Sequence, residues 1–101
     1  MKPSETMEAI VNRVRYSVKD STLLASDCYW DGRNMERSGR NVYLYKTPKG
    51  RYFAVYLTQW QGERDHITPM SEEEAYQLYE ELPEKEADVS AAFPSVGVED
   101  A

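Results

Sequence analysis

The sequence predicts an α+β fold, in which an antiparallel sheet of four or five strands carries one C-terminal helix, about residues 71–82, on one face. Three observations lead to this fold class. Residues 42–57 alternate around a Thr47-Pro48-Lys49-Gly50 turn, residues 71–82 repeat with helical period, and 41% of the 101 residues are hydrophobic. That length allows one modest core. We expect a single domain over residues 1–83 and an acidic, partly ordered tail over residues 84–101.

The segment before the central hairpin predicts further strands. Short apolar runs flank Asn12-Arg13 within residues 8–16, and asparagine favours a tight turn, so this segment is expected to form a small hairpin. Residues 23–30 read as a strand that ends at the Asp31-Gly32 turn. Residues 31–40 are polar and without period, which indicates a loop.

The central hairpin is apolar on both sides. Its turn pairs Tyr45 with Phe53 and Tyr43 with Val55, and side chains alternate between faces along each strand. One face then carries Tyr43, Tyr45, Phe53, Val55 and Leu57, and the other carries Val42, Leu44, Tyr52, Ala54, Tyr56 and Trp60. One helix can cover only one face. We expect the face with Tyr52, Tyr56 and Trp60 to be covered by the N-terminal segment, the tail, a second copy or a partner.

The helix is defined by its ends. Ser71 and Glu74 form a capping-box pattern, and Pro83 cannot continue a helix. The residues expected to face the sheet are Ala75, Leu78, Tyr79 and Leu82. Beyond the helix, Phe93 and Val96 are the apolar residues that can attach the tail to the body.

These motifs also carry a resemblance. Residues 41–53, then Trp60-Gln61-Gly62, then residues 71–75 resemble a loose group of small uncharacterised bacterial proteins. That group shares a Leu-Tyr-x-Thr-x-x-Gly-x-Tyr-Phe hairpin followed by a Ser-x-Glu-Glu-Ala helix. The resemblance covers roughly residues 13–82 and implies the fold together with an accessory role on mobile elements. It brings no catalytic residues.

Charge is unevenly distributed along the chain. The net charge is −6, yet residues 29–53 carry six basic and two acidic residues, whereas residues 72–101 carry ten acidic residues against Lys85. An acidic total disfavours broad non-specific DNA binding, which depends on neutralising phosphates. The basic middle leaves a local nucleic-acid contact open.

The sequence contains few side chains that could serve as metal ligands or as a catalytic nucleophile. Cys28 and His66 are the only soft or imidazole ligands, fewer than the four of a structural zinc site. They could pair as a nucleophile and its base, but Cys28 reads as a small buried hydrophobe in a strand. No glycine-rich phosphate loop is present. We therefore predict no enzyme activity, no cofactor and no metal.

Two loops have similar sequences, Trp30-Asp31-Gly32-Arg33 and Trp60-Gln61-Gly62-Glu63-Arg64. In an up-down meander they fall at the same end of the sheet. A recognition edge would then form, since tryptophan and arginine are frequent binding hot spots. Its candidate residues are Trp30, Arg33, Arg37, Arg40, Trp60 and Arg64. Alternatively, the tryptophans close the core and the loop charges pair with one another.

The preferred function is a non-catalytic protein-interaction module, and the resemblance adds an accessory or anti-defence role. The acidic helix, through Glu73, Glu80 and Glu81, would bind a basic, nucleic-acid-handling protein, or the uncovered sheet face would form a homodimer. An alternative is a small single-stranded nucleic-acid binder using Tyr52, Tyr56, Trp60 and the arginines. A small hydrolase is a weaker alternative. With no apolar run long enough to span a bilayer and no signal peptide, we expect no membrane contact and a cytoplasmic location.

Overall fold

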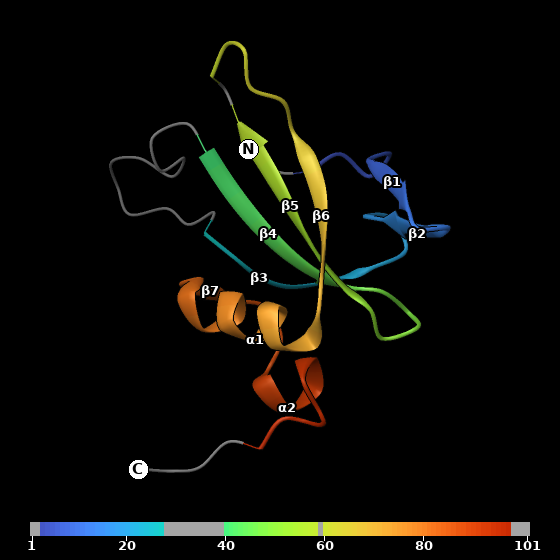
Figure 1. Ribbon diagram of the computed structural model, residues 1–101. Coiled ribbons are helices and arrows are strands. Elements are labelled where there is room, and N and C mark those ends of the chain that lie inside the picture. The colour runs from blue at the N-terminus through green and yellow to red at the C-terminus, as the bar shows by residue number, and fades with distance from the viewer. Residues whose placement is uncertain (1–2, 28–39, 59, 98–101) are drawn as a thin grey trace.

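The computed structural model describes residues 3–27, 40–58 and 60–97. It confirms the α+β class, with a five-stranded antiparallel sheet of order β6-β5-β4-β3-β7 and a separate two-stranded sheet β1-β2 (Figure 1). The strands are β1 Glu8–Val11, β2 Val14–Ser17, β3 Thr22–Ser26, β4 Arg40–Lys46, β5 Tyr52–Thr58, β6 His66–Met70 and β7 Glu84–Lys85. The helices are α1 Glu72–Glu81 and α2 Val89–Ala92.

The central hairpin β4–β5 has the register that the sequence predicts. Tyr45 pairs with Phe53 and Tyr43 with Val55. The turn is closed by the Thr47 amide, which donates to the Arg51 carbonyl at 2.8 Å, and by the Gly50 amide, which donates to the Thr47 carbonyl at 2.9 Å. Gly50 has φ +86°, a left-handed conformation that favours glycine.

Strand β6 was not anticipated from the sequence. It pairs with β5 from Tyr52↔Met70 to Tyr56↔His66 and forms one edge of the sheet. Its segment is short and contains Pro69, a residue that sheets accept mainly at an edge because it has no amide to donate. The edge position, set by tertiary pairing, makes the proline tolerable.

Helix α1 begins as predicted. The Glu74 amide donates to Ser71 Oγ at 3.1 Å, and the Ser71 amide donates to Glu74 Oε1 at 3.0 Å, completing the capping box. Leu82 follows the last turn as its C-cap. Ala75, Tyr79 and Leu82 are buried against the sheet, as the sequence predicts, and Leu78 is partly buried.

The face of Leu44 and Tyr52 is covered by helix α1, which the sequence assigns to the other face, and also by Phe93 of the tail, which is one of the covers that the sequence predicts. Met70 ends β6 and packs with this core cluster, and only Ser71 separates it from α1. The chain therefore folds back over the face to which Met70 contributes. The opposite face is covered by the β1–β2 hairpin, whose Tyr16 ring meets Phe53 edge-on with centroids 5.6 Å apart.

Residues 84–97, which the sequence assigns to the tail, pack on the body. Strand β7 pairs with β3, and Phe93 is fully buried with Leu24 and Tyr79. The Tyr52 hydroxyl donates to the Ala92 carbonyl at 2.8 Å. The core on the helix side is thus completed by the last described residues of the chain.

Candidate functional site

The helix-side face of the sheet is only partly covered. Strands β4, β5 and β6 extend beyond α1 in Figure 1, and a pocket of about 620 Å³ lies on their free ends. We call it the sheet-end pocket. Val42, Tyr56 and His66 form its floor, and the Tyr56 and His66 rings stack with centroids 4.9 Å apart. Its rim contains Arg40, Thr58, Glu63 and Arg64.

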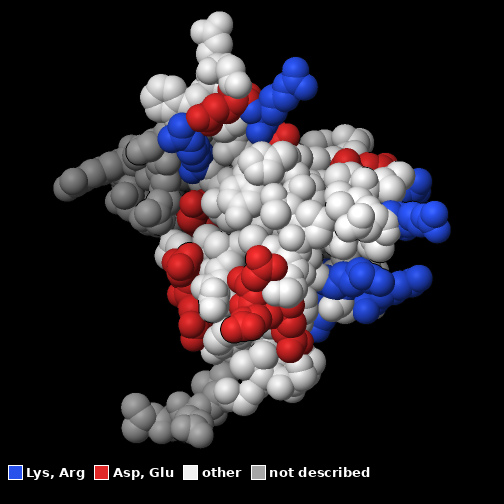
Figure 2. Space-filling view, viewed as in Figure 1, with Lys and Arg blue, Asp and Glu red and all other residues white. Residues whose placement is uncertain are grey.

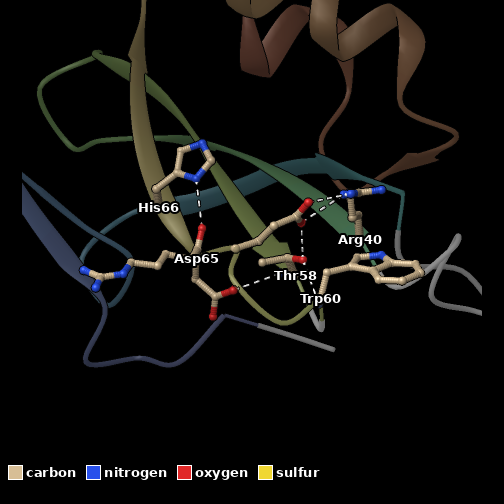
Figure 3. A network of polar contacts seen from close by, with 7 residues as sticks. Arg40, Thr58, Trp60, Asp65 and His66 are labelled. Carbon is tan, nitrogen blue, oxygen red and sulfur yellow. Dashed lines mark hydrogen bonds and ion pairs between the residues drawn. The ribbon is translucent and has the colours of Figure 1, made fainter.

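A polar network holds this rim (Figure 3). Arg40 donates twice to Glu63, from Nε at 3.1 Å and from Nη2 at 2.5 Å, and Thr58 Oγ1 donates to Glu63 Oε1 at 2.6 Å. The Thr58 amide donates to Asp65 Oδ1 at 2.8 Å. The hydrogen bonds from Arg40 and Thr58 lower the pKa of Glu63, and the same pairing raises the pKa of Arg40. The network links the end of β4 to the β5–β6 loop.

Trp60 stands at this rim and is 53% exposed. The Arg40 guanidinium lies 5.5 Å from the centre of its ring, within the range of a cation–π contact. Of the predicted recognition edge, Arg40, Trp60 and Arg64 are therefore brought to one end of the sheet. Trp30, Arg33 and Arg37 lie outside the described residues.

Helix α1 supplies acidic residues that lie outside the lining of the pocket. Glu73, Glu80 and Glu81 are all exposed on this helix, and acidic residues gather over it in Figure 2. Burial is the main cause that raises the pKa of the Tyr56 hydroxyl, and the charges of Glu74 and Glu81 raise it further. The helix carboxylates therefore act on the floor of the sheet-end pocket.

Tyr52, which the sequence suggests as a binding residue, is buried and cannot contact a partner. It is 4% exposed, and its ring stacks on that of Phe93 with centroids 4.9 Å apart. Its hydroxyl donates a hydrogen bond to the Ala92 carbonyl. The nucleic-acid alternative had assigned this ring to base stacking. The tail is among the segments that the sequence predicts to cover this face, and its residues Ala92 and Phe93 do cover the ring.

Metal and nucleophile chemistry gain no support from the described residues. Cys28 lies outside them, and His66 is exposed, with Nδ1 3.2 Å from the Arg64 carbonyl. Within residues 3–27, 40–58 and 60–97, no three histidine, cysteine or acidic side chains gather as a metal site would require.

A second surface was missed by the sequence analysis. A groove of about 480 Å³ lies between the β1–β2 turn and the β4–β5 turn, and its cationic lining residues are Arg13, Arg15, Lys49 and Arg51. These arginines belong to segments 38 residues apart in the chain, from Arg13 to Arg51, so no local motif joins them. Two signals were available in the sequence, namely the basic segment 29–53, which contains Lys49 and Arg51, and Arg13, which follows asparagine where a tight turn usually has glycine.

Comparison with known proteins gives no indication of function, so the proposal below is argued from the geometry of the sites. The chain matches no protein family, and it has no significant match among curated proteins or solved structures. In the described part of the chain, neither helix combines the length and the apolar character that crossing a membrane would need.

Proposed function

We propose that this protein is a non-catalytic protein-interaction module, and that its sheet-end pocket and the adjoining face of α1 bind a basic segment of a partner protein. The observation that carries the proposal is the position of the Tyr56–His66 ring pair. The rings form an accessible floor, and carboxylates of α1 act on it. Of the two arginines that line the pocket, Arg40 and Arg64, Arg40 is already paired with Glu63.

An arginine or lysine of the partner suits this arrangement. Its aliphatic stem would cover the stacked rings, while its charge would face the carboxylates of Glu74 and Glu81. Trp60, exposed beside the pocket, adds a residue type that often dominates binding energy. A phosphate would meet the opposite field at this site, which favours a protein partner over a nucleic-acid strand.

Basic surfaces are typical of nucleic-acid-handling proteins, so we infer a partner of that class. Occupying such a surface would block access of nucleic acid to it. This is consistent with the accessory or anti-defence role that the resemblance implies. A homodimer through the same pocket is the competing arrangement, and it predicts a concentration-dependent solution mass.

The test is capture of a partner from nuclease-treated lysate, followed by its identification by mass spectrometry. Tyr56→Ala and Glu81→Lys should each reduce recovery of the same protein. Ile10→Ala is the matched control, because Ile10 is 63% exposed on β1, which packs on the other face of the sheet. Circular dichroism spectra would establish that each variant is folded.

Two results would reject the proposal. Recovery that survives both Tyr56→Ala and the triple change of Glu73, Glu80 and Glu81 to lysine would remove this surface from the interaction. Recovery that disappears on nuclease treatment would show that the captured protein arrives through nucleic acid. A mass that doubles with concentration, and returns to monomer in Tyr56→Ala, would assign the pocket to a second copy.

A further inference from the structure

A basic groove lies between the β1–β2 and β4–β5 turns. Among its lining residues, Arg13, Arg15, Lys49 and Arg51 are cationic and Asp20 is the only acidic one. All four cationic residues are exposed. Basic side chains gather on this side of the molecule in Figure 2, whereas acidic residues gather over α1. We call this surface the hairpin groove.

The groove keeps a net positive charge even with Asp20 in its lining and Glu8 beside Arg15. Arg15 Nε lies 3.1 Å from Glu8 Oε2, so its charge is shared with that carboxylate. In the part of the chain that the structure describes, the side chains of Arg13, Lys49 and Arg51 make no hydrogen bond or ion pair. Three cations are therefore free to meet an anion from solution.

Arg13 occupies a backbone position that its side chain does not favour. The β1–β2 loop has two residues, Asn12 at φ +52° and Arg13 at φ +65°. A two-residue turn with both residues left-handed prefers asparagine followed by glycine. A side chain held in such a conformation indicates a use for it, because glycine would fold there with less strain.

Hydrogen-bond donors accompany the cations. Thr47 Oγ1 accepts the Arg51 amide at 3.0 Å, which leaves its hydroxyl hydrogen available to donate. The lining also includes Ser17 and Ser21, of which the Ser21 hydroxyl already donates to the Ser17 carbonyl at 2.6 Å, and it contains no aromatic side chain. Guanidinium groups and hydroxyls together match phosphate oxygens, whereas the absence of aromatic residues from this lining gives bases nothing to stack on.

We propose that the hairpin groove binds phosphate groups of a nucleic-acid backbone through Arg13, Lys49 and Arg51. Binding there is independent of sequence, since phosphate contacts carry no base information. An acidic protein fits less well, because the apolar lining is limited to Val14 and Pro48 and offers no aromatic anchor. The acidic total charge makes the interaction weak, and the small number of phosphate contacts gives it a modest dependence on salt.

The test is fluorescence anisotropy of the full chain with a dye-labelled oligothymidine of about 20 nucleotides, which exceeds the usual site size of small single-strand binders. Three phosphate contacts predict a slope of log affinity against log salt of about −2. Arg13→Gly should weaken binding roughly fivefold to tenfold at low salt and make that slope shallower by about 0.7. Arg13→Lys, which keeps the charge in the same turn, should remain within about twofold of the unmodified chain.

Lys19→Gln is the matched control. Lys19 is exposed on the β2–β3 turn and does not line the groove, yet this change removes the same charge. Arg13→Gly relieves backbone strain, so weaker binding in that variant cannot be attributed to loss of the fold. A duplex of the same length should show a similar dependence on Arg13.

Several outcomes would overturn the assignment. An equal loss in Lys19→Gln and Arg13→Gly would show binding by net charge rather than by the groove. No binding of either strand or duplex would reject it outright. Arg13-dependent binding to anionic phospholipid vesicles alone would assign the groove to lipid phosphate, and Arg13-dependent self-association alone would assign it to the acidic face of a second copy. The hairpin groove and the sheet-end pocket share no residue, so this result is independent of partner capture.

Discussion

Tyr52 lies stacked on Phe93, with ring centroids 4.9 Å apart and ring planes 11° apart. These residues are 41 positions apart, and the contact joins the first residue of β5 to the segment after α2. Tyr76 and Tyr79 meet the same Phe93 ring edge-on. Phe93 is therefore the point where the sheet, α1 and the C-terminal segment meet.

The first prediction concerns this ring. Phe93→Ala should lower the free energy of unfolding by about 3–5 kcal/mol, because it removes a fully buried aromatic side chain and leaves a cavity. Chemical denaturation followed by circular dichroism measures the loss. Ile10→Ala, at a residue that is 63% exposed, should stay within about 0.5 kcal/mol of the unmodified protein. Similar values for the two variants would contradict the packing of residues 84–97.

The second prediction concerns the β1–β2 turn. Arg13→Gly should raise the free energy of unfolding by about 0.5–1 kcal/mol, since glycine accepts φ +65° without the clash of a Cβ atom. Arg13→Ala keeps the strain and should gain nothing. Thermal unfolding of the three proteins at one pH distinguishes them. A destabilised Arg13→Gly variant would show that the arginine side chain supports the fold.

The third prediction concerns the capping box. Hydrogen bonds from Ser71 lower the pKa of Glu74 in the folded protein. A lowered pKa contributes stability at neutral pH that is lost as pH falls through the folded value. Glu74→Gln should therefore lose less stability than the unmodified chain between about pH 5 and pH 3. Ser71→Ala should cost about 1 kcal/mol at neutral pH. Unfolding by denaturant at each pH checks both, and equal acid sensitivity of Glu74→Gln and the unmodified protein would refute the first.

The fourth prediction concerns the floor of the sheet-end pocket. Burial and the charges of Glu74 and Glu81 raise the pKa of Tyr56. Glu81→Gln should move that pKa toward the ordinary value, because it removes one of the two nearby charges. The difference in tyrosinate absorbance between each protein and its Tyr56→Phe variant isolates this hydroxyl among eight tyrosines.

The sign of the Tyr56 effect on stability follows from the same shift. A raised pKa stabilises the fold fully below the unfolded value of about 10, and that contribution is lost as pH rises through the folded value. Tyr56→Phe should therefore show a smaller loss of stability in alkali than the unmodified chain. An identical alkaline loss would contradict the burial of this hydroxyl.

The local elements were readable from the sequence because each depends on neighbours in the chain. The Thr47–Gly50 turn set the β4–β5 register, Ser71 and Glu74 set the start of α1, and Asn12-Arg13 set the β1–β2 turn. Each of these features closes hydrogen bonds over a few residues. A short segment of sequence is therefore enough to predict each of them.

Tertiary structure alone decided how these elements cover one another. Hydrophobic patterning showed that both faces of the hairpin need cover. The hydrophobic effect is non-directional, so an apolar residue does not specify which distant segment will bury it. The pattern therefore could not assign α1 to Tyr52 or β1–β2 to Phe53. The same limit concealed β6, the rings on which Phe93 packs and the gathering of Arg13 with Arg51. The sequence by itself determined which segments are strands, turns and helix at these sites. The distant contacts that decide which side chains are left to bind arise only when those segments pack.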